Sequence, residues 1–116
     1  MYGFPDSIDL NQLVDTALVA VTYSSNSIHL DFSKWGVTVF GRLDIETIAG
    51  VQHTETPPVE ISKLVGVVGQ SVVAACLQGT RTLELRMSDG SRIRLVDDSV
   101  EFESLILRLE DTEYIV

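Results

Sequence analysis

The stretch LELRMSDGSRIRL, residues 83–95, decides the fold of this chain. Apolar and polar residues alternate on both sides of Asp89-Gly90, a pattern typical of two antiparallel strands joined by a tight turn. Such alternation places one face of each strand in a core and the other face in solvent. The sequence therefore predicts a β-hairpin here.

The same pattern occurs earlier in the chain. Residues 28–33 alternate in the way that residues 83–88 do. The block 43–48 matches the block 100–105 in character, since both read apolar, acidic, apolar, acidic, hydroxyl, apolar. The matched blocks keep their order at offsets that run from 51 to 57 residues, so we expect an internal duplication.

The two expected halves, about 1–58 and 59–116, meet at Pro57-Pro58, the clearest break in the chain. Each half opens with apolar residues at helical spacing, which predicts a short helical turn. These residues are Leu10, Leu13 and Val14 in the first half and Ile61, Leu64 and Val65 in the second.

About four strands follow each turn, so the chain is expected to be mainly β, with about eight strands in one domain, 1–116. An antiparallel sheet of that size folds into a β-sandwich or closes into a barrel, with the halves related by a pseudo-twofold axis. The match to 43–48 favours a strand at the start of 100–110, although Leu105, Ile106 and Leu109 also fit a helix.

The chain length, the lengths of its apolar runs and its cysteine count predict a soluble domain in the cytoplasm. The chain has 116 residues, no apolar run near the ~20 residues that span a bilayer, and no secretory signal pattern at its start. Its one cysteine, Cys76, cannot form an internal disulfide, and its apolar surroundings predict a buried, inert thiol.

The net charge of −9 argues against nucleic acid as a partner, because binding to phosphates requires clustered Lys and Arg. Acids are concentrated in residues 97–113, which form either a solvated edge or a docking surface for a basic protein. Trp35, at an expected hairpin tip, is either an interface anchor or a cap on the core. The candidate partner-binding residues are Trp35, Asp97, Asp98, Glu101, Glu103, Glu110, Asp111 and Glu113.

The chain lacks the patterns of known catalytic and cofactor sites. His29 lies on an expected strand and His53 in an expected loop, and neither has a neighbour at metal-ligand spacing. No serine lies in a nucleophile elbow, and the glycines of residues 66–69 do not form a phosphate loop. We therefore expect a protein that is not an enzyme and that uses no cofactor and no metal.

Residues 64–110 of the second half carry a series of short motifs: Leu64-Val65-Gly66, Leu83-x-Leu85, Asp89-Gly90, Ile93-x-Leu95 and Glu101-Phe102-Glu103-Ser104. With these motifs, this part of the chain resembles a group of small bacterial β-rich domains of unknown function. Members of such groups are encoded beside polymorphic toxins and behave like immunity proteins, as in contact-dependent inhibition. The resemblance implies a protein partner and no catalytic residues.

Three functions fit these observations. The first is an immunity protein that neutralises a basic toxin, such as a nuclease, by covering its active surface with carboxylates. The second is a structural or self-assembling β-domain, which the apolar C-terminus 114–116 would serve. The third is a closed barrel that binds a small ligand. The sequence favours the first and leaves the oligomeric state open.

Overall fold

The computed structural model describes residues 3–5, 7–98, 103–110 and 112–116, and these residues form ten β-strands in two antiparallel five-stranded sheets. The helical elements in this part of the chain are two single turns of 3₁₀ helix, η1 (Leu10–Gln12) and η2 (Leu64–Val67). The prediction of a mainly-β chain is confirmed, and a helical turn precedes each group of strands as expected.

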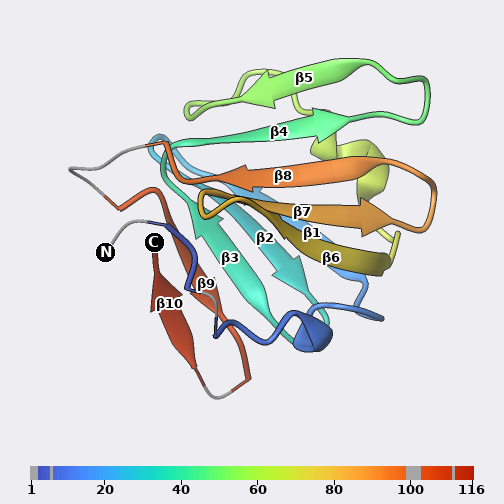
Figure 1. Cartoon of the computed structure of the whole chain (residues 1–116). Helices are drawn as coiled ribbons and strands as arrows, with labels where there is room; N and C mark the ends of the chain where they lie inside the picture. The colour runs from blue at the N-terminus through green and yellow to red at the C-terminus, as the bar shows by residue number, and fades with distance from the viewer. Residues whose placement is uncertain (1–2, 6, 99–102, 111) are drawn as a thin grey trace.

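The first sheet has the strand order β1-β2-β3-β9-β10, and the second has the order β5-β4-β8-β7-β6 (Figure 1). The first sheet consists of β1 (Leu18–Tyr23), β2 (Ile28–Phe32), β3 (Gly36–Val39), β9 (Leu105–Arg108) and β10 (Glu113–Ile115). The second consists of β4 (Arg42–Glu46), β5 (Gln52–Glu55), β6 (Val72–Gln78), β7 (Thr82–Met87) and β8 (Arg92–Val96). Each sheet thus joins a three-stranded meander to a hairpin from the other half of the chain.

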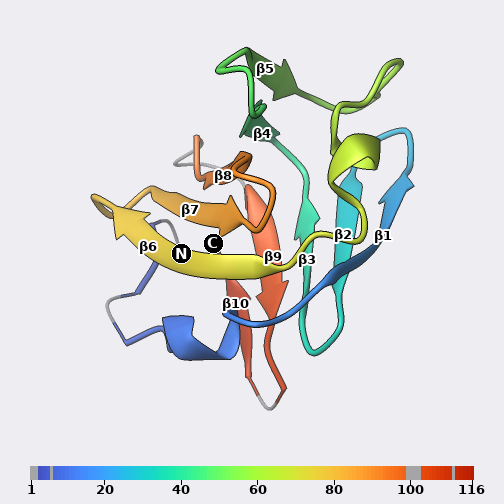
Figure 2. The ribbon, with the colours of Figure 1, turned by 90° about the vertical axis from the view of Figure 1, so that its right-hand side faces the viewer.

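The two sheets enclose one core. In Figure 2 their strands run in clearly different directions, and the two sheets share no strand. Apolar side chains from both sheets, including Leu30, Val37, Leu85, Ile93 and Leu107, have no exposed surface. The layered, sandwich-like alternative is therefore the correct one, and the closed barrel expected as the other alternative is wrong.

The hairpin predicted from residues 83–95 is confirmed. In the β7–β8 ladder Leu83 lies opposite Leu95, and Leu85 lies opposite Ile93, so the apolar residues of both strands share the core face. Gly90 adopts a positive φ of 91° in the turn, a backbone conformation that glycine reaches without steric cost. The turn therefore fixes the register that buries the alternate residues.

The two halves meet just before β1 and β6. A single antiparallel bridge joins Ala17 to Ser71 at this point. The β1–β2 ladder shifts register after Leu18, and the β6–β7 ladder shifts in the same way after Val72. Both meanders thus begin with the same local irregularity.

The expected count of eight strands is too low, because β5 and β10 do not alternate clearly enough to be recognised from sequence. The expected match between 43–48 and 100–105 is also out of register. Leu43 lies opposite Leu95 of β8, and Leu105 lies opposite Val39 of β3, so Leu43 corresponds in position to Leu105. The sequence match is therefore wrong by five residues, and part of it (residues 99–102) falls outside the described residues.

Candidate functional site

The predicted partner-binding residue Asp97 is buried at the end of β8, with 1% of its surface exposed. Its carboxylate accepts hydrogen bonds from the Gly3 backbone amide and, at 2.8 Å, from the Ser104 hydroxyl. The Arg81 guanidinium lies 3.9 Å away. Asp97 therefore links three separate segments of the chain, those of Gly3, Arg81 and Ser104. Its buried side chain is not available for contact with a partner.

The exposed predicted acids lie at the two ends of β9. Asp98 and Glu103 precede β9, whereas Glu110 and Glu113 follow it, in the β9–β10 hairpin, whose turn lies at the other end of β9 in Figure 1. Glu113 forms an ion pair of 3.0 Å with Arg108. Residues 97–113 therefore do not form one continuous patch in the part that the structure describes. Two further predicted residues, Glu101 and Asp111, lie outside the described residues.

Trp35 packs into the core, as the second alternative for it proposed. Its side chain is 5% exposed, and its ring stacks on Phe32 with 4.1 Å between centroids. The indole N–H donates a hydrogen bond of 2.8 Å to the Thr16 hydroxyl. Trp35 lines an open depression together with Glu110, so these two predicted residues are brought together, but the buried indole is not available as an interface anchor.

Two other expectations about the surface need correction. Val116 is fully buried and exchanges backbone hydrogen bonds with Leu105, so the apolar C-terminus is part of the fold. Cys76, expected to be buried, is exposed on β6 because its side chain lies on the outer face of the second sheet. Its thiol lies 3.7 Å from a carboxylate oxygen of Glu84.

The most prominent apolar surface lies elsewhere, around η2 and the β4–β5 turn. Nine large apolar side chains are exposed in the described part of the chain, and five of them fall within residues 48–68, so exposure is concentrated in one segment. We call these five residues the η2 surface: Ile48, Val51, Ile61, Val65 and Val68. Their exposed fractions run from 40% to 74%.

A shallow, mainly apolar pocket joins the two parts of this surface. Its lining combines Ile48 and Ala49 of the β4–β5 turn with Gly66 and Val67 of η2. The turn is held by a backbone hydrogen bond of 2.9 Å from Thr47 to Val51. The η2 surface is therefore built on paired backbone, although most of its residues lie outside strands.

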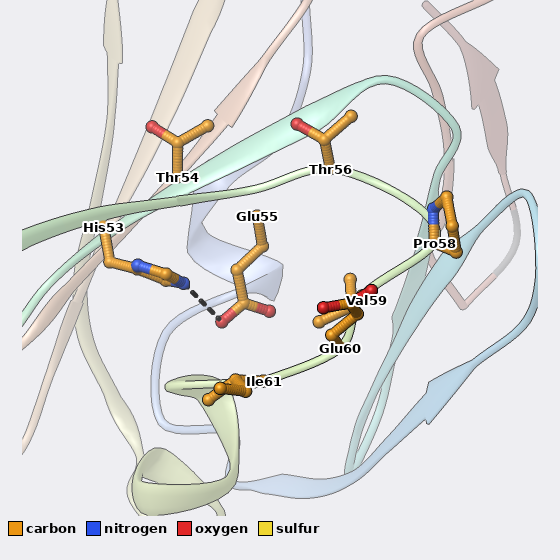
Figure 3. Close-up of a pocket in the computed structure, with 8 residues that line it drawn as sticks. All are labelled: His53, Thr54, Glu55, Thr56, Pro58, Val59, Glu60 and Ile61. Carbon is orange, nitrogen blue, oxygen red and sulfur yellow. Dashed lines mark ion pairs between the residues drawn. The ribbon is translucent and has the colours of Figure 1, made fainter.

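A second pocket, of about 320 Å³, opens beside Ile61 where β5 leads into the Pro57-Pro58 turn (Figure 3). Residues from the end of β5 and from the following loop line it: His53, Thr54, Glu55, Thr56, Pro58, Val59, Glu60 and Ile61. The Glu55 carboxylate faces the imidazole of His53, with 3.9 Å between His53 Nε2 and Glu55 Oε2. We call this the Glu55 pocket.

Hydrogen bonds hold the Glu55 carboxylate in place. The backbone amide of Lys63 donates to Glu55 Oε2 at 2.7 Å, and the Ser62 hydroxyl donates at 3.2 Å to Oε1. The Tyr23 hydroxyl is hydrogen-bonded to Ser62. Burial raises the pKa of the Tyr23 phenol, and the nearby charge of Glu55 raises it further, against the lowering effect of the bond to Ser62.

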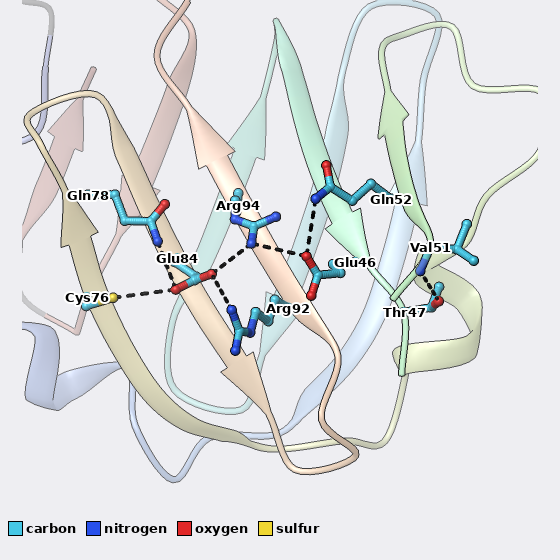
Figure 4. A network of polar contacts seen from close by, with 9 residues as sticks. All are labelled: Glu46, Thr47, Val51, Gln52, Cys76, Gln78, Glu84, Arg92 and Arg94. Atoms are coloured by element: carbon cyan, nitrogen blue, oxygen red, sulfur yellow. Dashed lines mark hydrogen bonds and ion pairs between the residues drawn. The ribbon is translucent and has the colours of Figure 1, made fainter. Parts of the chain in front are cut away.

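The outer face of the second sheet carries a different kind of polar cluster (Figure 4). Glu84, only 4% exposed, lies 3.2 Å from Arg94 and 3.8 Å from Arg92. Arg94 also reaches Glu46 at 3.4 Å, and Gln52 donates to the same carboxylate. These ion pairs and hydrogen bonds connect four neighbouring strands, and they pair most of the charged side chains on this face with an opposite charge.

The bases of the chain are concentrated on that face. Four of the eight, Arg42, Arg86, Arg92 and Arg94, lie there, together with three of the 14 acids that the structure describes, Asp44, Glu46 and Glu84. This face therefore carries a net charge of +1, and the other described residues, with four bases and 11 acids, carry −7. In the described part of the chain, the net negative charge thus lies away from the outer face of the second sheet.

Sequence reasoning missed both the η2 surface and the Glu55 pocket. His53 was expected in a loop, but it lies in β5, and its neighbour Glu55 is buried at the inner side of that strand. The one signal in the sequence was Pro57-Pro58 beside the acidic residues Glu55 and Glu60.

Comparison with protein-family models, with curated proteins and with solved structures finds no match to this chain. In the described residues there is no group of three or more potential metal ligands, and no helix is long and apolar enough to cross a membrane.

Proposed function

We propose that this chain is a protein-binding module and that the η2 surface is its main contact. The concentration of exposed apolar side chains in one segment is the observation that carries the proposal. Large exposed apolar patches on soluble proteins mark interaction sites, whereas single exposed apolar residues are normal. The shallow apolar pocket between the β4–β5 turn and η2 brings Ile48 of the turn close to Gly66 and Val67 of η2.

The proposed partner is a basic protein. The charge of −7 that the described residues carry outside the outer face of the second sheet would speed the approach of a cationic partner and would disfavour acidic ones. The exposed predicted acids, Asp98, Glu103, Glu110 and Glu113, contribute to this field from both ends of β9. The chain then acts as an immunity protein that covers the active surface of a cognate toxin, such as a nuclease, and performs no catalysis itself.

The proposed compartment is the cytoplasm. Cys76 is an exposed free thiol, and exposed thiols persist in reducing compartments, whereas in oxidising ones they are prone to form mixed disulfides.

A capture experiment with matched variants tests the binding proposal. The wild-type chain, Ile48→Asp and Val73→Asp are each used as bait in extracts of the native cells, at low and high salt. Val73 is 54% exposed on β6, outside the η2 surface, and so provides a control for the added charge. We expect one stoichiometric basic protein with the wild type and Val73→Asp, its loss with Ile48→Asp, and weaker retention at high salt.

Equal retention by Ile48→Asp would contradict the assignment of the surface. Recovery of the bait alone, with sedimentation as an oligomer, would instead favour the structural or self-assembling alternative.

We also infer that the two halves arose by duplication. Supporting this, strands β6 to β10 repeat the roles of β1 to β5, because exchanging the two sets converts one sheet order into the other. The junction supports it as well, since Leu18 donates to the Gln70 carbonyl and Val72 donates to the Thr16 carbonyl, both at 2.9 Å. Each half would then contribute its hairpin to the sheet of the other half.

A further inference from the structure

Glu55 occupies a position that a core residue would normally fill. It lies opposite the fully buried Leu43 in the β4–β5 ladder, and only 2% of its own surface is exposed. The corresponding place beside β9 holds Val116, which bonds to Leu105 and is fully buried. The chain therefore places a carboxylate where the equivalent site of the other half has an aliphatic side chain.

The charge of this carboxylate lacks a strong cationic partner. In the described residues the basic group within 4.0 Å of it is His53, whose Nε2 lies 3.9 Å away. The hydrogen bonds from Ser62 and Lys63 satisfy oxygen lone pairs but add no opposite charge. Burying an ionised carboxylate is costly unless it is both hydrogen-bonded and paired. In the described structure, the Glu55 carboxylate is thus well hydrogen-bonded but incompletely paired with positive charge.

The walls of the Glu55 pocket suit a side chain that has an aliphatic stem and a charged end. Pro58, Val59 and Ile61 provide apolar wall, and Glu60 adds a second carboxylate to the lining. Figure 3 shows the Glu55 carboxylate between His53 and the loop that carries Glu60. Lysine and arginine side chains bury their methylene groups along apolar surface while their heads pair with carboxylates. Ile61 also belongs to the η2 surface, so a partner on that surface lies beside the pocket.

We propose that the Glu55 pocket receives an arginine or lysine side chain of the basic partner, which takes the place of His53 as the ion-pair partner of Glu55. This inference rests on the proposed function and specifies how the partner is recognised. His53 is the exposed member of its pair, with 36% of its side chain exposed against 0% for Glu55, so movement of the imidazole gives an incoming cation access to the carboxylate. An ion pair formed here is shielded from water and contributes to specificity.

The test uses the full chain, labelled with nitrogen-15, and two small probes of matched shape. The cationic probe is n-butylguanidinium, and n-butylurea is its neutral counterpart at the same ionic strength. We expect saturable shifts of the Glu55 and Lys63 backbone amide resonances with n-butylguanidinium alone. Glu55→Gln, which keeps the side-chain volume and an oxygen acceptor, is expected to weaken binding at least tenfold. Asp31→Asn, which removes an exposed acid outside this pocket, is expected to bind within twofold of the wild type.

Equal shifts with both probes, or unchanged affinity in a folded Glu55→Gln variant, would overturn the inference. Should Glu55→Gln not fold, Glu60→Gln is the second variant: at least threefold weaker binding supports the pocket, and unchanged affinity overturns it. The outcome is separate from that of the proposed function. If n-butylguanidinium does not bind but Ile48→Asp still abolishes capture of the partner, only the role of the Glu55 pocket fails.

Discussion

Replacing Asp97 and its neighbour Asp98, one at a time, by alanine should have very different consequences for stability. Asp97 is buried and accepts bonds from the Gly3 amide and the Ser104 hydroxyl. Asp98 is exposed, and its ion pair with Arg42 measures 3.9 Å. The two residues are adjacent and chemically identical, so the comparison isolates the effect of burial.

The size of the difference follows from the contacts. A hydrogen bond to a charged group contributes about 1.5–3 kcal/mol, and Asp97→Ala leaves two buried donors without an acceptor, so we expect a loss of about 3 kcal/mol. An exposed ion pair contributes about 0–1 kcal/mol, so Asp98→Ala should change the free energy of unfolding by less than about 0.5 kcal/mol. With a urea slope of about 1.5 kcal/mol/M, Asp97→Ala lowers the unfolding midpoint by about 2 M.

Urea unfolding followed by tryptophan fluorescence measures both variants, because Trp35 is the single tryptophan of the chain and is buried. Midpoints within 0.3 M of each other, roughly 0.5 kcal/mol at that slope, would refute the assignment of Asp97 as a residue that fastens the fold. In that case Asp97 would again be a candidate partner-binding residue.

Three further changes test other parts of the structure. Trp35→Phe keeps a ring for Phe32 to stack on but removes the donor to Thr16, so urea unfolding followed by circular dichroism should show a loss of about 1–2 kcal/mol; no loss would contradict the hydrogen bond. The pKa of the Tyr23 phenol is raised in the folded state, so the contribution of Tyr23 to stability should be complete below about pH 10 and be lost as the pH rises further. In Tyr23→Phe that fall should be smaller, as measured by unfolding at pH 8 and pH 11, and an identical fall would contradict the raised pKa. Gly90→Ala should cost about 1–2 kcal/mol, because alanine is strained at a φ of 91° although no atom lies within 4 Å of the added carbon; calorimetry showing no destabilisation would contradict that geometry.

The strands that alternate clearly could be predicted from the sequence. The hairpin of residues 83–95 has both a two-residue period and a turn that only a few residue types form, so its register was predictable. Strand β5 could not be recognised, because its inner positions hold His53 and Glu55 in place of apolar residues. Polar residues at core positions remove the pattern by which a strand is identified.

The helical spacing before the second group of strands predicted a short helical turn but not which of its residues are buried. Ile61 and Val65 are exposed, whereas Leu64 is buried with Val67. A 3₁₀ helix has three residues per turn, so residues i and i+3, here Leu64 and Val67, lie on the same side. The spacing of apolar residues alone therefore did not reveal the η2 surface.

The acids of residues 97–113 are close together in sequence, which suggested a single surface patch. In the structure β9 separates the two ends of this stretch, and Asp97 is buried. Charge counts predict the sign of the partner and not the place where it binds, because the fold distributes the acids over several elements.

Photo-crosslinking from the η2 surface tests the central claim most directly. The photoreactive residue p-benzoylphenylalanine would replace Val65 in one chain and Val73 in another, and both would be irradiated in the native cells. We expect one dominant adduct with a basic protein from position 65 and none from position 73. Equal adducts from both positions, or adducts only between copies of this chain, would contradict the assignment of the η2 surface as the contact for a basic partner.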